Sequence, residues 1–586
     1  DRDGNTVQDP IALLEALRRY ADRMSVFCHA GGIHVPPRHQ QLLAYVEKSV
    51  VQVLPPRPDR NFHPKVWVLR YLAEDGGVTY RVLCQSRNLT FDRSWDTVVV
   101  LEGQLDQSRR NAFSKNRPLS DFASTLPELA VAPPGDHVQE QVDLVADEVL
   151  RVRFSPPPGF SDFAWEPIGI SRRYSWPFPR KVNRLAVVSP FAESSLLAKL
   201  AGMSRGHVAL VSSEHQLASL PPQALRPFSE VLYMLPEADA EETEELQTRD
   251  TEQPEDNDAV ADADPSGAPT ALSGLHAKLY VADVGWEAQL WTGSANATSS
   301  AFGGNVEFMV RLDGRKVMHG VEALLGFPDD GSVGFRSLLA EFPLHQEEAE
   351  LDPDGEDGER QLREARSLIA QVGFIAQLDP LAEGSRAFSV ALVRRQAWTR
   401  RFPQGVTGRC WPVSLRPELS VALATEGRVA AGFPRLSFEG VTSFFAFELS
   451  LGEGADRQEM RFVLNVPLEG EPPNRQQEVL HQILQNRERL LRFLMLLLSD
   501  SDMDVSRLFS DNQSSAGTWS NAFGGAADEP LLERLLKALN RESGKLADVK
   551  SLVEELRATP QGRDLLPPEF DLVWPSVVAV YEELQR

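Results

Sequence analysis

The stretch LHAKLYVAD at residues 275–283, followed by GSAN at 293–296, decides how this chain is expected to fold. A related stretch occurs about 200 residues earlier as FHPKVWVLR at 62–70, followed by SRNLT at 86–90. With 11 His and 10 Lys in 586 residues, only about 0.2 His-x-Lys triplets are expected by chance, so the repeat indicates an internal duplication. We therefore expect one site assembled from two equivalent halves.

The two copies carry the same polar residue types in the same order. Each triplet lies in a run of branched and aromatic residues that is typical of a β-strand, so its His and Lys are expected to share a face. The next apolar run ends in Ser and Asn, and a third run opens with an acid. The candidate site residues are His63, Lys65, Ser86, Asn88 and Asp96 in the first copy and His276, Lys278, Ser294, Asn296 and Glu307 in the second.

This set of side chains suits phosphodiester hydrolysis. A neutral imidazole can attack phosphorus to form a phosphohistidine, while a second imidazole protonates the leaving oxygen and later activates water. Lysine ammonium and asparagine amide groups can stabilise charge on the phosphoryl oxygens. Asp96 and Glu307 can each orient an imidazole, although acids and hydroxyls at strand ends also serve as backbone caps. The inventory requires no metal and no other cofactor.

The second copy resembles the signature of the phospholipase D superfamily, His-x-Lys-x4-Asp followed by Gly-Ser-x-Asn, with Asp283 and Gly293 in place. The first copy departs from it at Arg70 and Gln85; the tyrosyl-DNA phosphodiesterase branch, which this copy resembles, also lacks the Asp. The resemblance spans residues 20–330 approximately. It implies two α/β/α layered half-domains related by a pseudo-twofold axis and a structural role for Asp283. It also implies a nucleophile from the first half, His63, with His276 as the acid.

The resemblance further implies a metal-independent phosphodiesterase, a nuclease that acts on nucleic acid, with DNA favoured over RNA. Similar architectures with appended modules serve in bacterial anti-phage defence, which implies a helicase or ATPase partner. Two alternatives remain open. Arg70 and Gln85 fit a catalytically weak scaffold that binds nucleic acid or such a partner, and the superfamily also includes phospholipid hydrolases. A homodimer is open as well.

Composition favours a cytoplasmic protein away from membranes. No apolar run reaches 18 residues, and Cys28, Cys84 and Cys410 are too far apart in sequence for a disulfide framework or a metal pair. Net charge is −24, but residues 237–264 hold 13 acids and one Arg, which is half of that total. We expect this acidic insert to be a mobile linker, or a shield over a cationic cleft.

Basic residues with interleaved aromatic residues occur between the two halves and again at 394–401. Such clusters can pair with phosphates and stack on bases, and they equally fit ordinary surface charge over a packed Trp. The candidate nucleic-acid-binding residues are Arg172, Arg173, Trp176, Arg180 and Lys181.

The pattern of apolar residues divides the chain into four regions. Residues 1–158 and 159–335 are the two α/β halves, 336–472 a linker and β-rich accessory domain, and 473–586 a helical accessory domain. Because a helix-like stretch at 11–23 opens the first half, we expect a strand of that half to lie upstream of residue 1. A single helix is expected at 478–498.

Overall fold

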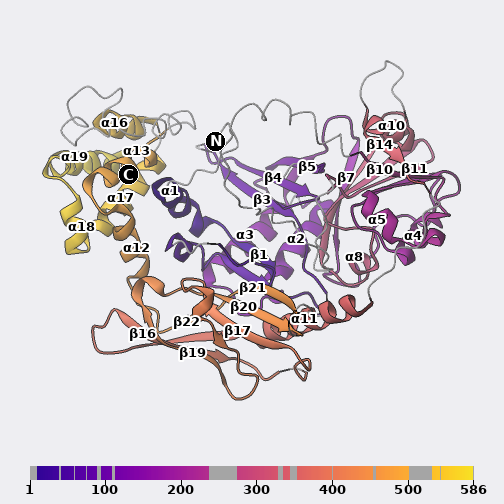
Figure 1. Ribbon diagram of the computed structural model, residues 1–586. Helices are drawn as coiled ribbons and strands as arrows, with labels where there is room; N and C mark the ends of the chain where they lie inside the picture. The colour runs from indigo at the N-terminus through magenta and orange to yellow at the C-terminus, as the bar shows by residue number, and fades with distance from the viewer. Residues whose placement is uncertain are drawn as a thin grey trace, which may run out of the picture.

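The computed structural model describes the chain except for residues 1–9, 38–40, 58–59, 74, 89–93, 109–111, 236–273, 327–333, 344–352, 399, 453, 455–456, 500–530, 542 and 585–586. The acidic insert at 237–264 lies outside the described residues. The described part is a mixed α/β fold with five β-sheets (Figure 1). None of its helices is long and apolar enough to cross a membrane.

Two sheets form the first predicted half. One is a parallel pair of strands, β1 (Val26–His29) and β2 (Val50–Val53). The other contains β3 (Val66–Leu72), β4 (Val78–Gln85), β5 (Val98–Leu105) and β6 (Val152–Ser155), in that order and antiparallel throughout. Helices α2 (Arg117–Thr125) and α3 (Asp136–Val149) lie between β5 and β6 in sequence. Leu119 of α2 and Val138 of α3 share an apolar core with Tyr80 of β4, so these helices cover one face of this sheet.

A single eight-stranded sheet forms the second predicted half. Its strands are β7 (Asp162–Ile168), β8 (Arg184–Val188), β9 (Val208–Ser212), β10 (Glu230–Met234), β11 (Leu279–Val284), β12 (Glu287–Gly293), β13 (Glu307–Arg315) and β14 (Leu339–Glu341). Their order is β14-β10-β9-β8-β11-β12-β13-β7, with β8, β9 and β10 parallel and the other neighbours antiparallel. The helices between them are α4 (Ser194–Ala201), α5 (Glu214–Ser219), α6 (Pro222–Leu225), α8 (Ser299–Gly303), α9 (Lys316–His319) and α10 (Val321–Leu325).

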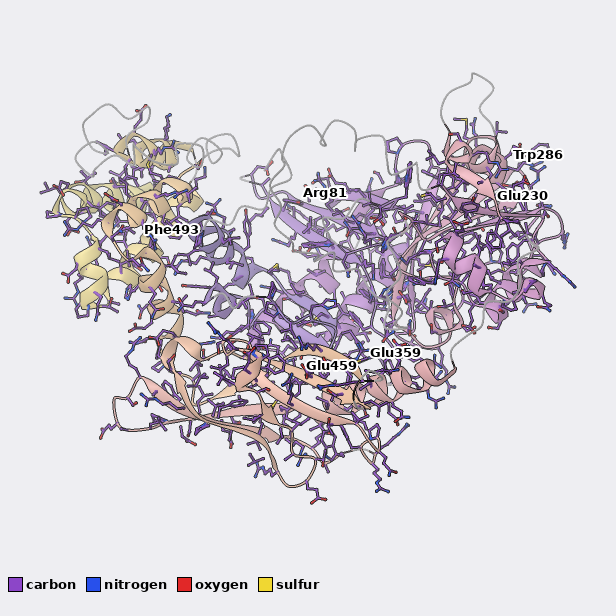
Figure 2. All side chains as sticks on the ribbon, in the orientation of Figure 1. Arg81, Glu230, Trp286, Glu359, Glu459 and Phe493 are labelled. Carbon is purple, nitrogen blue, oxygen red and sulfur yellow. The ribbon has the colours of Figure 1, made fainter. Side chains whose placement is uncertain are left out.

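The two halves share a strand pattern but differ in how their sheets are covered. Strands β3-β4-β5-β6 match β11-β12-β13-β7 in order and direction. In the second half, Tyr280 and Met309 are fully buried in the core that contains α4. The equivalent residues of the first half are Trp67, two residues after its Lys, and Val98, two residues after its acid. These side chains are 41% and 57% exposed. Arg81 lies on this same exposed face, paired with Glu102 (Figure 2).

The third region is β-rich and begins with helix α11 (Pro353–Val372). Its strands are β15 (Phe374–Pro380), β16 (Ala387–Arg394), β17 (Thr407–Pro412), β18 (Val421–Ala422), β19 (Val429–Ser437), β20 (Phe444–Leu451), β21 (Gln458–Asn465) and β22 (Leu468–Glu469). They form two four-stranded sheets, β19-β16-β15-β22 and β18-β17-β20-β21. Aromatic side chains such as Phe445, Phe447 and Trp411 are buried in one core with the apolar face of α11.

The C-terminal region is helical. Its helices are α12 (Arg475–Leu484), α13 (Arg487–Leu497), α16 (Leu531–Arg541), α17 (Ser543–Arg557), α18 (Pro560–Leu565) and α19 (Pro568–Leu584). The single helix predicted at 478–498 is wrong, because the backbone breaks at Gln485 (φ 44°) and Asn486 caps a new helix. Helix α1 (Pro10–Tyr20) packs here as well: its Ile11 and Leu14 share a core with Leu480 of α12 and with Leu42 and Tyr45 of the first half.

Candidate active site

Each His segment pairs with the acid-bearing segment of the other half. The backbone N–H of His63 donates to the carbonyl of Val306 at 2.8 Å, immediately before Glu307. Reciprocally, the N–H of His276 donates to the carbonyl of Trp95 at 2.8 Å, immediately before Asp96. This exchange of partners joins the two repeats into one structure.

The strand prediction for the two triplets is wrong in detail. Strand β3 begins at Val66 and β11 at Leu279, so each His and Lys precedes its strand. The segments instead form isolated bridges across the halves, Phe62 with Val306 and Leu275 with Trp95. The side chains therefore lie at the contact between the halves.

Glu307 is the centre of a cluster of side chains from both halves. Its carboxylate is 1% exposed, and its Oε2 lies 3.0 Å from Nδ1 of His63 and accepts from Ser294 Oγ at 2.5 Å. Asn305 Nδ2 donates to the other oxygen at 3.2 Å. A carboxylate on Nδ1 holds that nitrogen in its protonated form and leaves the lone pair on Nε2. Three residues of the second half thus orient the imidazole of the first.

The electrostatics of this cluster favour the ionised carboxylate. Burial by itself raises the pKa of Glu307, because a charge in a poorly solvated place is costly. The neighbouring His63 and Lys65 and the hydroxyl of Ser294 oppose this effect and lower the pKa below its usual range. Glu307 is therefore a hydrogen-bond acceptor at neutral pH, as orientation of His63 requires.

The first half repeats part of this arrangement around Asp96. Ser86 Oγ donates to Asp96 Oδ1 at 3.0 Å and accepts from Thr97 N at 2.9 Å. In the second half Ser294 Oγ likewise accepts from the residue after the acid, Phe308 N, at 3.0 Å. The difference is Arg87, whose Nε lies 2.6 Å from the other oxygen of Asp96. Asp96 therefore shares its charge with an arginine that has no counterpart in the second half.

The two lysines are held in the same way. Lys65 Nζ donates to the carbonyl of His63 at 3.3 Å, and Lys278 Nζ to that of His276 at 3.0 Å. Both lysines are buried. Each ammonium thus lies beside the His of its own triplet.

Two threonines join the half-sites. The hydroxyls of Thr97 and Thr292 lie 2.5 Å apart, and that of Thr292 also donates to the carbonyl of Lys278 at 2.9 Å. Thr97 N in turn donates to Ser86 Oγ. A chain of hydrogen bonds thus runs between the predicted site residues of the two copies.

The two asparagines differ in setting. Asn296 is 5% exposed, and its Oδ1 is buried without a hydrogen bond to any described residue. Asn88 is exposed and directly precedes residues outside the described part. Buried polar groups in folded proteins are rarely unsatisfied, so the amide of Asn296 is suited to meet a ligand.

The copies differ at the Asp of the signature, which is Asp283 in the second copy and Arg70 in the first. Both residues make contacts that stabilise the fold. Asp283 is buried, and its Oδ1 accepts from the N–H of Val321 at the start of α10, 3.0 Å away. Arg70 instead makes two hydrogen bonds to Glu148 of α3, at 2.7 and 3.1 Å. Each residue ties its sheet to a helix.

The predicted nucleic-acid-binding cluster is partly packed into the second half. The Trp176 ring contacts Phe178 and Phe302, and Lys199 Nζ lies 3.3 Å from its centroid. Lys181 donates to the carbonyl of Gly202. The structure thus leaves three exposed arginines of this cluster for a role in binding: Arg172, Arg173 and Arg180.

Asn305 is the positioning residue that the sequence did not reveal. Besides donating to Glu307, its Oδ1 accepts from the N–H of Asn61, so it joins the carboxylate to the chain that leads into His63. The residue at its place in the first copy is Ser94, so the repeat gave no signal for it.

No family model matches the chain, and no curated protein matches it. Among solved structures, the chain is similar to yeast tyrosyl-DNA phosphodiesterase and to two variants of that protein. Identity is 11–12%, the match covers 47% of this chain and 72–74% of those chains, and the TM-scores are 0.26–0.27. Tyrosyl-DNA phosphodiesterase is a member of the phospholipase D superfamily.

Proposed function

We propose that the two halves form one active site of a metal-independent phosphodiesterase, a nuclease that cleaves DNA or RNA through a covalent phosphohistidine. The observation that carries this proposal is the exchange between halves, in which Glu307 of the second copy orients His63 of the first. This exchange supports a site to which both copies contribute side chains.

The reaction follows from this geometry. Nε2 of His63, freed by the Nδ1 contact to Glu307, attacks phosphorus. A P–N bond forms and the P–O bond to the leaving oxygen breaks, while His276 donates a proton to that oxygen. His276 then takes a proton from water, the water oxygen attacks phosphorus, and the P–N bond breaks. Lys65, Lys278 and the amide of Asn296 stabilise the charge on the phosphoryl oxygens.

A cleavage assay tests the proposal. Labelled single- and double-stranded DNA and RNA are incubated with the protein in EDTA, alongside His63→Ala and His276→Ala. His207→Ala is the matched control, because this His pairs with Glu230 on the second-half sheet, outside the described clusters. We expect the wild type and the control to cleave at equal rates and both test variants to be inactive. Full activity in both test variants would exclude the mechanism.

The same proposal includes a preference for DNA, a helicase or ATPase partner, a role in anti-phage defence and a cytoplasmic location. The three exposed arginines between the halves, Arg172, Arg173 and Arg180, would contact phosphates. Their replacement by Ala is expected to weaken nucleic-acid binding and to flatten its dependence on salt, measured by fluorescence anisotropy.

One observation favours a second candidate, a scaffold that binds nucleic acid without cleaving it. Arg87 lies 2.6 Å from Asp96, so this acid is less able to orient a His than Glu307 is. The Arg87→Ala variant separates the two candidates. If the nuclease proposal is right, the wild type cleaves nucleic acid. A wild type that binds nucleic acid without cleaving it, together with an Arg87→Ala variant that does cleave it, would favour the scaffold.

A further inference from the structure

The two halves match in strand order except at one position. The sheet of the second half runs β14-β10-β9-β8-β11-β12-β13-β7. In the first half, residues 129–131 pair with β2 as β14 pairs with β10, β2 lies parallel to β1 as β10 does to β9, and β3-β4-β5-β6 correspond to β11-β12-β13-β7. Within the described residues β8 has no counterpart. Its equivalent in the first half is a position between β1 and β3, which we call the insertion position.

Both strands that border the insertion position are more exposed than their counterparts. All five residues of β9 are buried, whereas none of the four residues of β1 is, and Val26 is 37% exposed. Four residues of β11 are buried, whereas no residue of β3 is, and Tyr71 is 47% exposed. In the second half β8 pairs with both β9 and β11. No described strand pairs with the corresponding edges of β1 and β3.

The outer edge of β3 presents backbone groups for a further strand. The carbonyl of Lys65 accepts from the N–H of Gln85 at 2.9 Å, so the backbone groups of Lys65 face β4. Because these directions alternate along an antiparallel strand, the N–H and C=O groups of Val66, Val68 and Arg70 face away from β4. A row of such groups at a sheet edge is a template for pairing with another strand.

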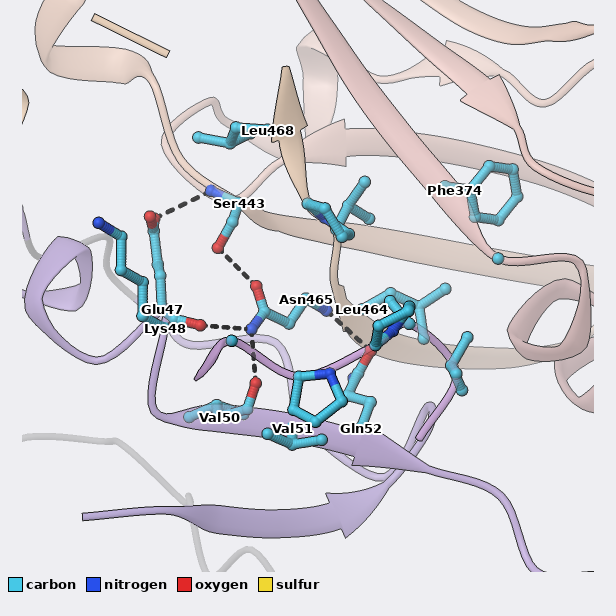
Figure 3. Close-up of a pocket in the computed structure, with 18 of the residues that line it drawn as sticks. Glu47, Lys48, Val50, Val51, Gln52, Phe374, Ser443, Leu464, Asn465 and Leu468 are labelled. Carbon is cyan, nitrogen blue, oxygen red and sulfur yellow. Dashed lines mark hydrogen bonds between the residues drawn. The ribbon is translucent and has the colours of Figure 1, made fainter. Parts of the chain in front are cut away.

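The borders of the insertion position are held in place. At the end of β21, Asn465 donates from Nδ2 to the carbonyl of Val50 at 2.8 Å and from its backbone N–H to Gln52 Oε1 at 2.9 Å, which fixes β2 and with it β1 (Figure 3). His29 at the end of β1 accepts from the N–H of Phe62, so β1 ends beside the segment that leads into β3. Borders that are fixed before a ligand arrives lower the cost of binding.

The sequence of residues 1–586 does not supply this strand. Every strand of the described part already belongs to one of the five sheets. The stretches outside the described part hold no four consecutive apolar side chains such as Leu185–Val188 of β8. In the second half α4 follows β8 after residues 189–193, but α1, which precedes β1 as α4 precedes β9, packs in a core with α12 and α13 (Figure 1). This arrangement favours a strand from another chain.

We propose that the insertion position binds an extended apolar segment of a partner protein, which adds as a strand parallel to β1 and antiparallel to β3. These are the directions of β8 relative to β9 and β11. Neighbouring residues of β8, such as Leu185 and Ala186, lie in cores on opposite faces of the sheet, so the segment is expected to be apolar on both faces. In this mode of recognition main-chain hydrogen bonds supply affinity, and alternate side chains supply specificity.

The added strand also completes the first half-site, a step that rests on the proposed function. In the second half, the chain after β8 holds the residue next to Asn296: the N–H of Ala297 donates to Ser189 Oγ at 2.9 Å, and its carbonyl accepts from the N–H of Glu193 at 2.9 Å. Asn296 is buried, whereas its counterpart Asn88 is exposed. A partner segment with a similar continuation would hold the chain at Asn88 in the same way.

Fluorescence anisotropy with the whole protein tests the docking. The probe is a labelled peptide with the sequence of residues 182–193, which covers β8 and the segment after it. We expect one-site binding and, by hydrogen-exchange mass spectrometry, slower amide exchange in β1 and β3 when the peptide is bound. An Ala186→Pro peptide should bind roughly tenfold more weakly or worse, because Pro cannot donate to a neighbouring strand.

Val68 provides a matched pair of protein variants. Val68→Pro removes an N–H from the outer edge of β3, where Pro is tolerated, and Val68→Ile keeps it. We expect the Pro variant to bind the peptide roughly tenfold more weakly and the Ile variant to bind it as the wild type does. Circular dichroism melting checks that both fold. Absence of peptide binding, or equal binding by the Pro peptide and by Val68→Pro, would overturn the inference.

Cleavage of labelled DNA tests the completed half-site separately. A saturating peptide should raise the cleavage rate by roughly tenfold or more, because a better-held catalytic group is better aligned. Peptide binding with an unchanged cleavage rate would exclude this step. No cleavage with or without the peptide would count against the nuclease proposal, whereas the docking is decided by anisotropy alone.

Discussion

His29 lies directly behind the segment that carries His63. Its Nδ1 accepts the backbone N–H of Phe62 at 3.2 Å, so it supports the chain one residue before the proposed nucleophile. Burial lowers the pKa of His29 to about 3, and the neighbouring Arg366 and His63 act in the same direction. The imidazole is therefore neutral in the folded protein over the physiological range.

This burial predicts a loss of stability in acid. The folded pKa of about 3 lies below the unfolded value of 6.5, so the unfolded chain binds more protons at pH values between these two. The free energy of unfolding should therefore fall as pH drops below 6.5, by up to about 1.4 kcal/mol per pH unit from this group. His29→Gln should remove that part of the slope in urea unfolding from about pH 7.5 to about pH 5. Equal slopes for the two proteins would contradict the assignment.

Asn305 predicts a kinetic effect without loss of the fold. Asn305→Ala removes the hydrogen bond to Glu307 Oε1 and the contact to Asn61, which leaves the carboxylate less firmly held. We expect kcat to fall by about 10- to 100-fold, as for other supports of an orienting group, with KM little changed. Single-turnover cleavage measures this. An unchanged kcat would mean that Ser294 alone holds Glu307.

At the scale of single residues, the sequence predicted the His, Lys, Ser and acid residues as site residues because they occur twice. It did not predict which acid serves which His, since that depends on the exchange between halves. It also missed Arg87 as the partner of Asp96, because the second copy has Ala295 at that place. A repeat identifies the residues that the two halves share, but it gives no information on residues at which the halves differ.

At the scale of strands, we expect substitutions at equivalent positions of the two matched sheets to lower the free energy of unfolding by different amounts. Tyr280 of β11 is fully buried, and its hydroxyl donates to the carbonyl of Ala295 at 3.0 Å. Trp67 of β3 occupies the same place after its Lys but is 41% exposed. Tyr280→Ala should lower the free energy of unfolding by roughly 3–5 kcal/mol, and Trp67→Ala by about 1 kcal/mol. Denaturant unfolding measures both, and a larger loss for Trp67→Ala would contradict the sheet faces assigned here.

Strand prediction succeeded at 80–84 and 288–292, which lie within β4 and β12 and are mostly apolar. It failed at the two triplets, because their backbone pairs with the other half outside any named strand. The predicted helix at 478–498 failed at Gln485 for a local reason that the sequence did carry. Asn486 caps the helix α13, accepting from Arg489 N, and Asn is among the preferred residues at that position.

At the scale of the whole molecule, a buried ion pair ties the first half to the rest. Glu47 and Arg475 are almost fully buried and hydrogen bonded to each other, although 428 residues separate them. Glu47 Oε1 also accepts from Thr442 Oγ1 at 3.1 Å and from the N–H of Ser443 at 2.9 Å. This pair therefore holds together the first half, the β-rich region and the start of α12.

Removal of one partner should be costly. Glu47→Ala leaves a buried guanidinium without its carboxylate, so we expect a loss of roughly 3–5 kcal/mol in the free energy of unfolding. The double variant Glu47→Met with Arg475→Met should lose much less, since no charge is left buried. Denaturant unfolding of the wild type and the two variants tests this, and a double variant that loses as much stability as Glu47→Ala would contradict the expected cost of a buried, unpaired charge.

Long-range contacts of this kind are what the sequence could not predict. An amphipathic helix such as α1 could pack on the first half or on the C-terminal helices. Its own sequence does not indicate that its apolar side chains pack on the C-terminal helices. The core of the first half likewise includes Phe308 and Val310 from β13 of the second. The four predicted regions remain a prediction, and packing crosses their boundaries at both of these places.

The proposal that both halves act on one phosphorus atom has a direct chemical consequence. Rapid quenching of a reaction with end-labelled DNA, followed by denaturing electrophoresis and peptide mapping, reports any covalent protein–DNA adduct. We expect an acid-labile adduct on His63 that forms and decays in the wild type and is absent from His63→Ala. Cleavage without an adduct at any time, or an adduct that persists in both His63→Ala and His276→Ala, would contradict the shared site.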